Sequence, residues 1–384
     1  MFEDNLSLSF SSKSTSSDNS LLSIPLLESS PKDHAELFSI LGIGDPIVDI
    51  ISEVDSKTIK ENGLKLGDSI FASEDCDNKN VEMFKLLESM SSVCYTPGGY
   101  VQNTLRVLSG CLNNDLSNRK LFKVSMLGSV GNDLYQKKIL HSLEDIGVNQ
   151  MLEILEGDKT SRCGVGVYKK EKMFITQLRA SKRLSERFIE NNFDKILEHQ
   201  AFLIEGYLIQ NKFEMVKKIS EAFYESNKTI ILTLSAKFIV QFHYEKIIEL
   251  ANRADIIAGS MEEALELAGN KGQNTQEVFE NIFRKLKPKE NRLLLITDGA
   301  NGAFCAKYDY QNNHLMSFLH CFANKLKDEE IKDLNGAGDA FLGGFLSEYM
   351  KGSEIYDCCK KGINAATIII KNVGCTFPKK TNFK

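Results

Sequence analysis

The stretch that decides the fold is Asp333-Leu334-Asn335-Gly336-Ala337-Gly338-Asp339, followed at once by the apolar run Ala340-Phe341-Leu342-Gly343-Gly344-Phe345-Leu346. Its small residues allow the backbone to approach a ligand closely, and the apolar run predicts a buried helix whose N-terminal end binds phosphate. Asp339 can then accept a proton from an attacking hydroxyl while neighbouring amides stabilise the charge on a migrating phosphoryl group. The alternative, that Asp339 only caps a helix, is disfavoured by the length and order of the pattern.

Composition restricts the class of protein. The chain has 384 residues, of which 42% are hydrophobic and 26% charged, enough for one large core with a smaller appended unit. The formal net charge of −5 disfavours a nucleic-acid partner, and no apolar run is long enough to span a bilayer. The 9 cysteines are scattered without a C-x-x-C pair, which indicates reduced thiols and a cytoplasmic location.

The pattern along the chain predicts an α/β fold. Residues 1–36 are rich in serine and indicate a flexible N-terminal tail without a targeting signal, and residues 37–384 form the folded domain. Short apolar runs alternate with amphipathic stretches, which predicts a central, mainly parallel sheet flanked by helices on both faces. The expected strands are Lys123 to Leu127, Ala201 to Glu205, Thr229 to Leu234, Asp255 to Gly259 and Arg292 to Thr297, and the expected helices include Phe213 to Tyr224 and Met261 to Leu267.

Two segments interrupt this alternation, at about 52–96 and at about 163–178. The alternating Cys163 to Tyr168 and Met173 to Thr176 indicate strands of a second, smaller sheet. Because the two segments are separated in sequence, they predict a discontinuous β lid over the carboxyl ends of the main strands, where open α/β sheets bind ligands.

The opening heptapeptide resembles the carboxyl-terminal signature of the ribokinase/pfkB family of carbohydrate and nucleoside kinases, D-T-x-G-A-G-D. Four further stretches occur in the order found in the adenosine kinase branch of that family: Gly42-Ile43-Gly44-Asp45-Pro46-Ile47-Val48-Asp49, Gly98-Gly99-Tyr100-Val101-Gln102-Asn103-Thr104, Leu234-Ser235-Ala236-Lys237-Phe238-Ile239 and Gly374-Cys375-Thr376-Phe377-Pro378. The resemblance covers about 37–384. It implies a ribokinase-like fold, a monomer, and transfer of a phosphoryl group from ATP to the 5′-hydroxyl of adenosine, giving AMP and ADP in purine salvage.

The resemblance also implies roles for residues around the sugar. Asp339 would be the base, and the backbone amides of Asn335, Gly336, Ala337 and Gly338 would form the anion hole. Asp49, expected at the end of the first strand, would accept hydrogen bonds from the ribose hydroxyls, with Asp45 and Asn103 nearby. Turn formation beside Pro46 is a fair alternative role for Asp45. Gly98 and Gly99 would form the hinge that lets the lid close and exclude water.

The predicted base pocket departs from the family pattern. Phe71 stands where the family suggests an aliphatic residue, and Leu208, beside Tyr207, stands where an aromatic often stacks on adenine. We therefore expect a purine between Phe71 and Leu208, with the alternative that Phe71 is only lid core. Tyr100 replaces a small residue beside the hinge and leaves the purine preference open.

The nucleotide side is implied by shorter matches. Thr297 and Gly299 would hold ATP, Thr233 would face the same crevice, and Asn364 would approach the adenine of ATP. Glu263 matches the glutamate that organises Mg²⁺ in the family's N-x-x-E motif, with Ser260 in place of the asparagine. Lys172 is expected either to cover the phosphates or, more simply, to lie in a solvated turn.

Two alternatives remain open from the sequence. A kinase of the same family for another nucleoside or a sugar would share the Asp339 cradle. A non-catalytic nucleoside-binding protein would keep the fold without turnover, and Ser260 and Leu334, which replace the usual Asn and Thr, favour it slightly.

Overall fold

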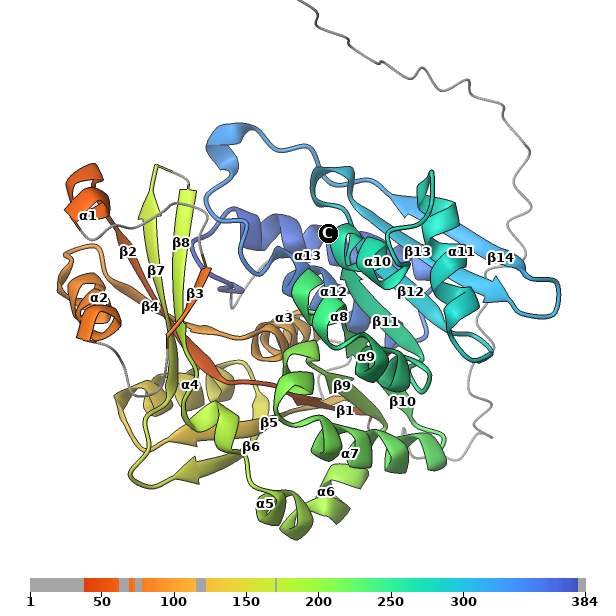
Figure 1. Cartoon of the computed structure of the whole chain (residues 1–384), viewed down its shortest axis with the longest axis horizontal. Helices are drawn as coiled ribbons and strands as arrows, with labels where there is room; N and C mark the ends of the chain where they lie inside the picture. Colours follow the sequence, from red (N-terminus) through yellow and green to blue (C-terminus); the bar gives the residue numbers. More distant parts are fainter. Residues whose placement is uncertain (1–37, 62–68, 73–77, 115–121, 170, 379–384) are drawn as a thin grey trace, which may run out of the picture.

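Two separate β-sheets organise the chain, a large one of nine strands and a small one of five (Figure 1). They are seen in a computed structural model that describes residues 38–61, 69–72, 78–114, 122–169 and 171–378. The predicted tail at 1–36 lies outside the described residues. Within those ranges, no helix has both the length and the apolar character needed to cross a membrane.

The large sheet has the order β14-β13-β12-β11-β10-β9-β1-β5-β6. All neighbours pair in parallel except β13, which is antiparallel to both β12 and β14. Its central strands are short and fully buried, as strands covered on both faces must be. The strands are β1 (Phe38–Ile43), β5 (Phe122–Gly131), β6 (Val148–Leu155), β9 (Ala201–Ile204), β10 (Thr229–Thr233), β11 (Ile256–Ser260), β12 (Leu293–Thr297), β13 (Ala303–Asp309) and β14 (His314–Cys321).

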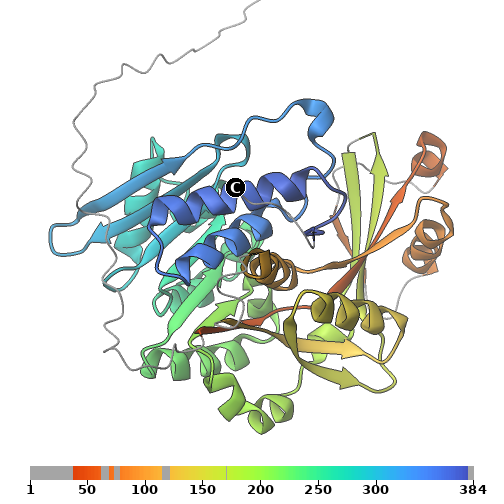
Figure 2. The ribbon, with the colours of Figure 1, turned by 180° about the vertical axis from the view of Figure 1, so that it is seen from behind.

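Helices cover both faces of the large sheet, and a separate apolar core lies between each face and its helices. The face toward the viewer in Figure 1 carries α5 (Glu186–Asn191), α6 (Phe193–Leu197), α7 (Phe213–Glu225), α8 (Lys237–Phe242), α9 (Tyr244–Ala251), α10 (Met261–Leu267) and α11 (Thr275–Lys285). The opposite face, toward the viewer in Figure 2, carries α3 (Tyr100–Asn114), α4 (Leu134–Asp145), α12 (Ala337–Tyr349) and α13 (Ile355–Ile370). The predicted architecture, a mainly parallel sheet flanked on both faces, is confirmed.

The small sheet has the order β3-β8-β7-β2-β4 and lies to one side of the large one (Figure 1). Its strands are β2 (Ile47–Glu53), β3 (Ser69–Phe71), β4 (Cys94–Gly98), β7 (Ser161–Tyr168) and β8 (Glu171–Gln177), accompanied by α1 (Ser56–Glu61) and α2 (Asn78–Ser89). The sheet is discontinuous in sequence, but it begins at Ile47 rather than near Ser52. The reason is that β1 ends at Ile43. The chain then turns through Asp45 and Pro46 directly into β2.

The predicted strands and helices agree with the structure to within a few residues. Several parts were not predicted. They include the edge strand β6, the antiparallel hairpin β13–β14 at the other edge, and α3, whose buried apolar face follows the Gly98-Gly99 pair. Asp49 was expected at the end of the first strand; this is wrong, because Asp49 belongs to β2 of the small sheet.

Candidate functional site

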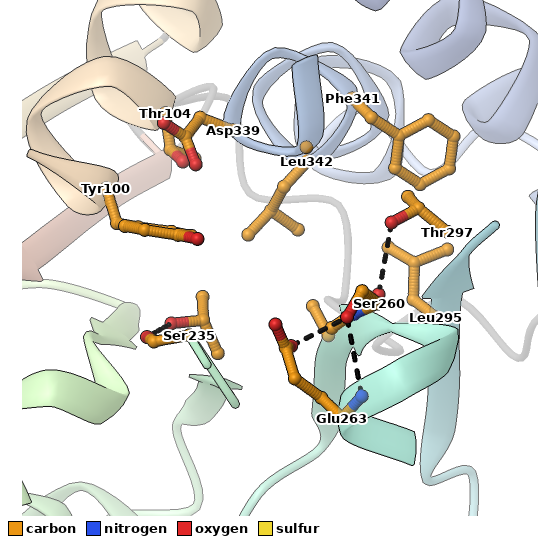
Figure 3. A pocket seen from close by; sticks show the side chains of 14 residues that line it. Tyr100, Thr104, Ser235, Ser260, Glu263, Leu295, Thr297, Asp339, Phe341 and Leu342 are labelled. Atoms are coloured by element: carbon orange, nitrogen blue, oxygen red, sulfur yellow. Dashed lines mark hydrogen bonds between the residues drawn. The ribbon is translucent and has the colours of Figure 1, made fainter. Parts of the chain in front are cut away.

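A cavity of about 100 Å³ lies where β10, β11 and β12 end and α12 begins (Figure 3). The carboxyl ends of parallel strands are the edge at which open α/β sheets bind ligands. Polar residues end the three strands there: Thr233, Ser260 and Thr297. The full lining comprises Tyr100, Thr104, Thr233, Ser235, Ala258, Gly259, Ser260, Glu263, Leu295, Thr297, Gly338, Asp339, Phe341 and Leu342.

Asp339 stands in the first turn of α12, where its carboxylate reaches the cavity. It is 6% exposed and accepts a hydrogen bond of 2.9 Å from Nδ2 of Asn103 on α3. Burial raises the pKa of Asp339 to about 7; the Asn103 bond opposes this rise, and the charges of Asp49 and Glu263 add to it. A carboxyl with a pKa near the working pH is well suited to act as a general base.

The backbone before α12 forms only part of the predicted anion hole. Gly336 caps the helix with φ 74°, a left-handed conformation that favours glycine. The amide of Asn335 donates to Asp333 Oδ1 at 2.8 Å and that of Ala337 to the Leu334 carbonyl at 3.3 Å. Among the described residues, the amides of Gly336 and Gly338 have no partner, so these two are free for an anion.

The turn between β4 and α3 contains the two glycines of the predicted hinge, and it is tightly packed. Gly99 has φ 98°, and a Cβ at Gly98 would lie 2.3 Å from Asp49 Oδ1. Gln102 holds the turn by donating to the Gly98 carbonyl at 2.6 Å. The glycine pair therefore allows the Asp49 carboxylate to lie directly against the backbone that leads into α3.

Asp49 lies among charged groups that link the small sheet to the loop before α12. Burial raises the pKa of Asp49 to about 7, the Asp333 charge raises it further, and Lys172 and Arg106 oppose the rise. Lys172, from β8, forms an ion pair with Asp333, and the two side chains are 12% and 1% exposed. The expectation of a solvated turn at Lys172 is therefore wrong, because its ammonium is held by a buried carboxylate.

Asp45 is held by a buried network under the turn. Lys212 Nζ lies 3.1 Å from Asp45 Oδ1, with both side chains 4% exposed. The backbone amide of Asp45 donates to Glu205 Oε2 at 3.2 Å. Burial raises the pKa of Glu205 well above its ordinary range. Lys212 and Glu205 were not found from the sequence, because neither lies in a recognisable motif.

Glu263 faces Asp339 across the cavity (Figure 3). Ser260 and Glu263 form a capping box at the start of α10: Ser260 N donates to Glu263 Oε2 at 3.0 Å and Glu263 N to Ser260 Oγ at 3.4 Å. Burial raises the pKa of Glu263. The serine thus keeps the helix start intact, and Glu263 Oε1 has no partner among the described residues.

The two halves of the predicted purine sandwich lie in different surroundings. Leu208 is buried in the apolar core and is absent from the lining of the cavity, so its place beside a purine stays a prediction. Phe71 on β3 is 54% exposed and contacts Phe238 of α8 edge-on, with ring centroids 6.4 Å apart. Tyr207, next to Leu208, contacts Phe238 at 5.9 Å and Tyr100 at 5.6 Å.

The residues expected to hold ATP are only partly brought together. Thr233 and Thr297 line the cavity, whereas Gly299 and Asn364 do not. Asn364 lies on α13, and its Oδ1 accepts a hydrogen bond of 3.0 Å from Asn324. Ser235 was quoted in a motif without a role; it lines the cavity in a left-handed conformation (φ 66°), an unusual state for serine that the sequence does not signal.

Comparison with known proteins identifies the family. The family model described as "pfkB family carbohydrate kinase" matches residues 64–382, which is well over half of the chain. The chain belongs to the pfkB family of carbohydrate kinases. Within the pfkB family, the chain is similar to adenosine kinase 2 of Arabidopsis thaliana, with 29% identity over 90% of this chain and 97% of the relative. It is also 28% identical to adenosine kinase of Dictyostelium discoideum, over 88% of this chain and 96% of the relative.

A solved structure agrees with this result for the fold. Anopheles gambiae adenosine kinase, in complex with P1,P4-di(adenosine-5) tetraphosphate, superposes with a TM-score of 0.77 at 26% identity, over 90% of this chain and 98% of that chain. The ribokinase-like fold expected from the signature is therefore confirmed. The pfkB signature of this chain forms the start of α12 and brings Asp339 to the cavity.

Proposed function

We propose that this protein is an adenosine kinase, which transfers the γ-phosphoryl group of ATP to the 5′-hydroxyl of adenosine and releases AMP and ADP. The observation that carries the proposal is the Asp339–Asn103 pair at the meeting of α12 and α3. Asp339 has a pKa of about 7, and the open amides of Gly336 and Gly338 lie just before it. The curated relatives matched along about nine tenths of the chain, which are named adenosine kinases, support the choice of acceptor.

Asp339 would take the proton of the 5′-hydroxyl as its oxygen attacks the γ-phosphorus. Phosphoryl transfer requires an in-line nucleophile, neutralised charge on the migrating group and a destination for the proton. The Gly336 and Gly338 amides, at the positive end of α12, would stabilise the oxygens of that group. Asn103 keeps Asp339 oriented, so the carboxylate needs no rearrangement when the nucleophile arrives.

The ribose would be recognised from the opposite side by polar groups near the turn. Asn103 Oδ1 is buried without a partner among the described residues, and it can accept a hydrogen bond from a sugar hydroxyl. Asp49 is a second acceptor, placed on the small sheet against Gly98. We propose that this sheet, from Ile47 to Gly98 and from Ser161 to Gln177, acts as a lid that excludes water during transfer.

The residues present fit a magnesium ion bound with ATP. Among the described residues, no group of three His, Cys, Asp or Glu side chains could hold a metal alone. Mg²⁺ is commonly bound by one or two carboxylates together with waters and substrate phosphates, and Glu263 Oε1 is such a carboxylate. Bound there, Mg²⁺ would neutralise charge on the donor phosphates. Thr233 and Thr297 would contact the same phosphates, with Gly299 and Asn364 further along ATP.

Location and assembly remain predictions. The cysteines that the structure describes are all free, as expected for a cytoplasmic protein in a purine salvage pathway. The monomeric state rests on the family resemblance.

The experiment that tests the function compares acceptors in one ATP-consumption assay. Adenosine, inosine, guanosine and ribose are offered separately at equal concentration, with the product identified by chromatography. We expect AMP and ADP in equal amounts from adenosine, with kcat/KM higher than for the other acceptors. Preference for ribose or inosine would replace this proposal by a sister kinase, and adenosine binding without AMP would leave a non-catalytic binding protein.

A further inference from the structure

A row of four aromatic side chains leads from the small sheet to the cavity. Phe71 of β3 contacts Phe238 of α8, Phe238 contacts Tyr207, and Tyr207 contacts Tyr100 at the start of α3. The ring centroids are 6.4, 5.9 and 5.6 Å apart, distances at which aromatic rings attract one another in tilted or edge arrangements. The row therefore packs the Tyr100 ring against Tyr207.

Tyr100 reaches into the cavity opposite Glu263 and below Asp339 (Figure 3). Tyr100 lines the cavity, and 37% of the residue is exposed. Within the described part of the chain, its hydroxyl has no hydrogen-bond partner. Burial, together with the charge of Asp339, raises the pKa of Tyr100 well above its ordinary range, so the hydroxyl keeps its proton.

The charges around the cavity indicate what this hydroxyl would bind. Asp339 and Glu263 line the cavity, but none of its described lining residues is lysine or arginine. A phosphoryl group entering between two carboxylates therefore needs a metal ion and neutral donors. Such donors are the amide of Gly338 and the hydroxyl groups of the lining residues. Tyr100, at the start of α3, supplies one of these hydroxyl groups.

We propose that Tyr100 is a further catalytic residue, whose hydroxyl donates a hydrogen bond to an oxygen of the phosphoryl group as it passes to the acceptor at Asp339. The inference rests on the proposed kinase function and adds a contact to it. The hydroxyl forms no covalent bond and transfers no proton. It stabilises the negative charge on the migrating group, together with the Gly336 and Gly338 amides.

The substitution Tyr100→Phe isolates this contact, because it keeps the ring and its packing on Tyr207 and removes only the donor. A hydrogen bond to a charged group typically contributes enough to change a rate by about 10- to 100-fold. We therefore expect kcat to fall by about that factor, with KM for adenosine changed by less than about threefold. Tyr356→Phe on the exposed face of α13 is the matched control and should behave as the unaltered protein.

A binding measurement separates this role from a packing role. Calorimetry with ADP, Mg²⁺, aluminium fluoride and adenosine reports affinity for a mimic of the migrating group, and ADP with Mg²⁺ alone reports the ground state. The Tyr100→Phe protein should bind the mimic about 10- to 100-fold more weakly and ADP unchanged. A kcat within twofold of the unaltered enzyme, or equal loss of both affinities, would overturn the inference while leaving the kinase function intact. An unaltered protein that makes no AMP would overturn both.

Discussion

Two carboxyls near the cavity, Asp339 and Asp49, both have a pKa raised to about 7, but their surroundings differ. Asp339 lies on α12, which packs against the large sheet, and its carboxylate accepts a hydrogen bond from the neutral amide of Asn103. Asp49 belongs to the small sheet and lies near the charges of Asp333, Lys172 and Arg106. We infer two roles from this difference: the carboxyl without a cation would accept a proton, whereas the carboxyl among ions would serve in binding and in positioning the small sheet.

The largest expected effect is that of Asp339→Asn, which keeps the shape of the side chain and removes the proposed base. General base catalysis contributes about 10²- to 10⁴-fold, so kcat should fall by that factor while the protein stays folded. The rate of AMP formation and the melting temperature would be measured together. A variant with unchanged melting and unchanged kcat would remove Asp339 from the reaction.

The next effect concerns the ions around Asp49. Lys172→Ala leaves Asp333 buried without its cation, and breaking a buried pair in this way costs roughly 3 kcal/mol of unfolding free energy. Urea unfolding would measure it. Lys57→Ala is the matched control, because its pair with Glu61 is solvent-exposed and contributes little. Equal stability of the two variants would show that Lys172 does not fasten the small sheet to the loop before α12.

Asp49→Asn should affect binding more than turnover. The amide keeps one acceptor oxygen but loses the charge that strengthens hydrogen bonds from ribose hydroxyls, so KM for adenosine should rise by about 10- to 100-fold. The loss of kcat should be smaller than in Asp339→Asn. Steady-state kinetics with 2′-deoxyadenosine provide the control. Because this acceptor lacks a hydroxyl that Asp49 would contact, its KM should differ less between the unaltered protein and Asp49→Asn.

The smallest effect is expected at Phe71, which is half exposed on β3. Phe71→Ala removes the outer end of the aromatic row but no polar contact, so apparent adenosine affinity should fall by about threefold to tenfold. Equilibrium binding of adenosine would measure this. An unchanged affinity would assign Phe71 to the surface of the small sheet and end its proposed role beside the purine.

The sequence predicted the parts of the molecule that are local. The heptapeptide ending in Asp339 specifies a helix start by its own glycines and apolar run, and the structure has α12 beginning at Ala337. The five predicted strands of the large sheet, β5, β9, β10, β11 and β12, were equally clear, because buried parallel strands are continuous apolar runs. The antiparallel hairpin β13–β14 was missed, since neither strand shows the regular alternation of apolar and polar residues that marks a half-buried strand.

Most contacts that depend on long-range packing were not predicted, apart from the meeting of Asn103 and Asp339 in one site. Leu208 and Tyr207 are neighbours in sequence, and only the fold decides that the first is core and the second faces Tyr100. Lys172 and Asp333 are 161 positions apart, so no spacing could indicate their ion pair. The buried contacts of Asp45 with Lys212 and Glu205 arise in the same way.

The most direct test of Asp339 as the base is the pH dependence of kcat at saturating adenosine, made on the unaltered protein and on Asp339→Asn. Saturation removes the separate effect that protonation of Asp49, whose pKa is also raised to about 7, has on KM. Burial raises the pKa of Asp339, so its carboxylate is present above about pH 7 and is protonated below it. We predict that kcat at saturating adenosine falls about tenfold for each unit below that pH, and that Asp339→Asn loses this limb together with most of its activity. A limb that persists unchanged in Asp339→Asn, or a flat profile in the unaltered protein, would contradict the assignment of Asp339 as the base.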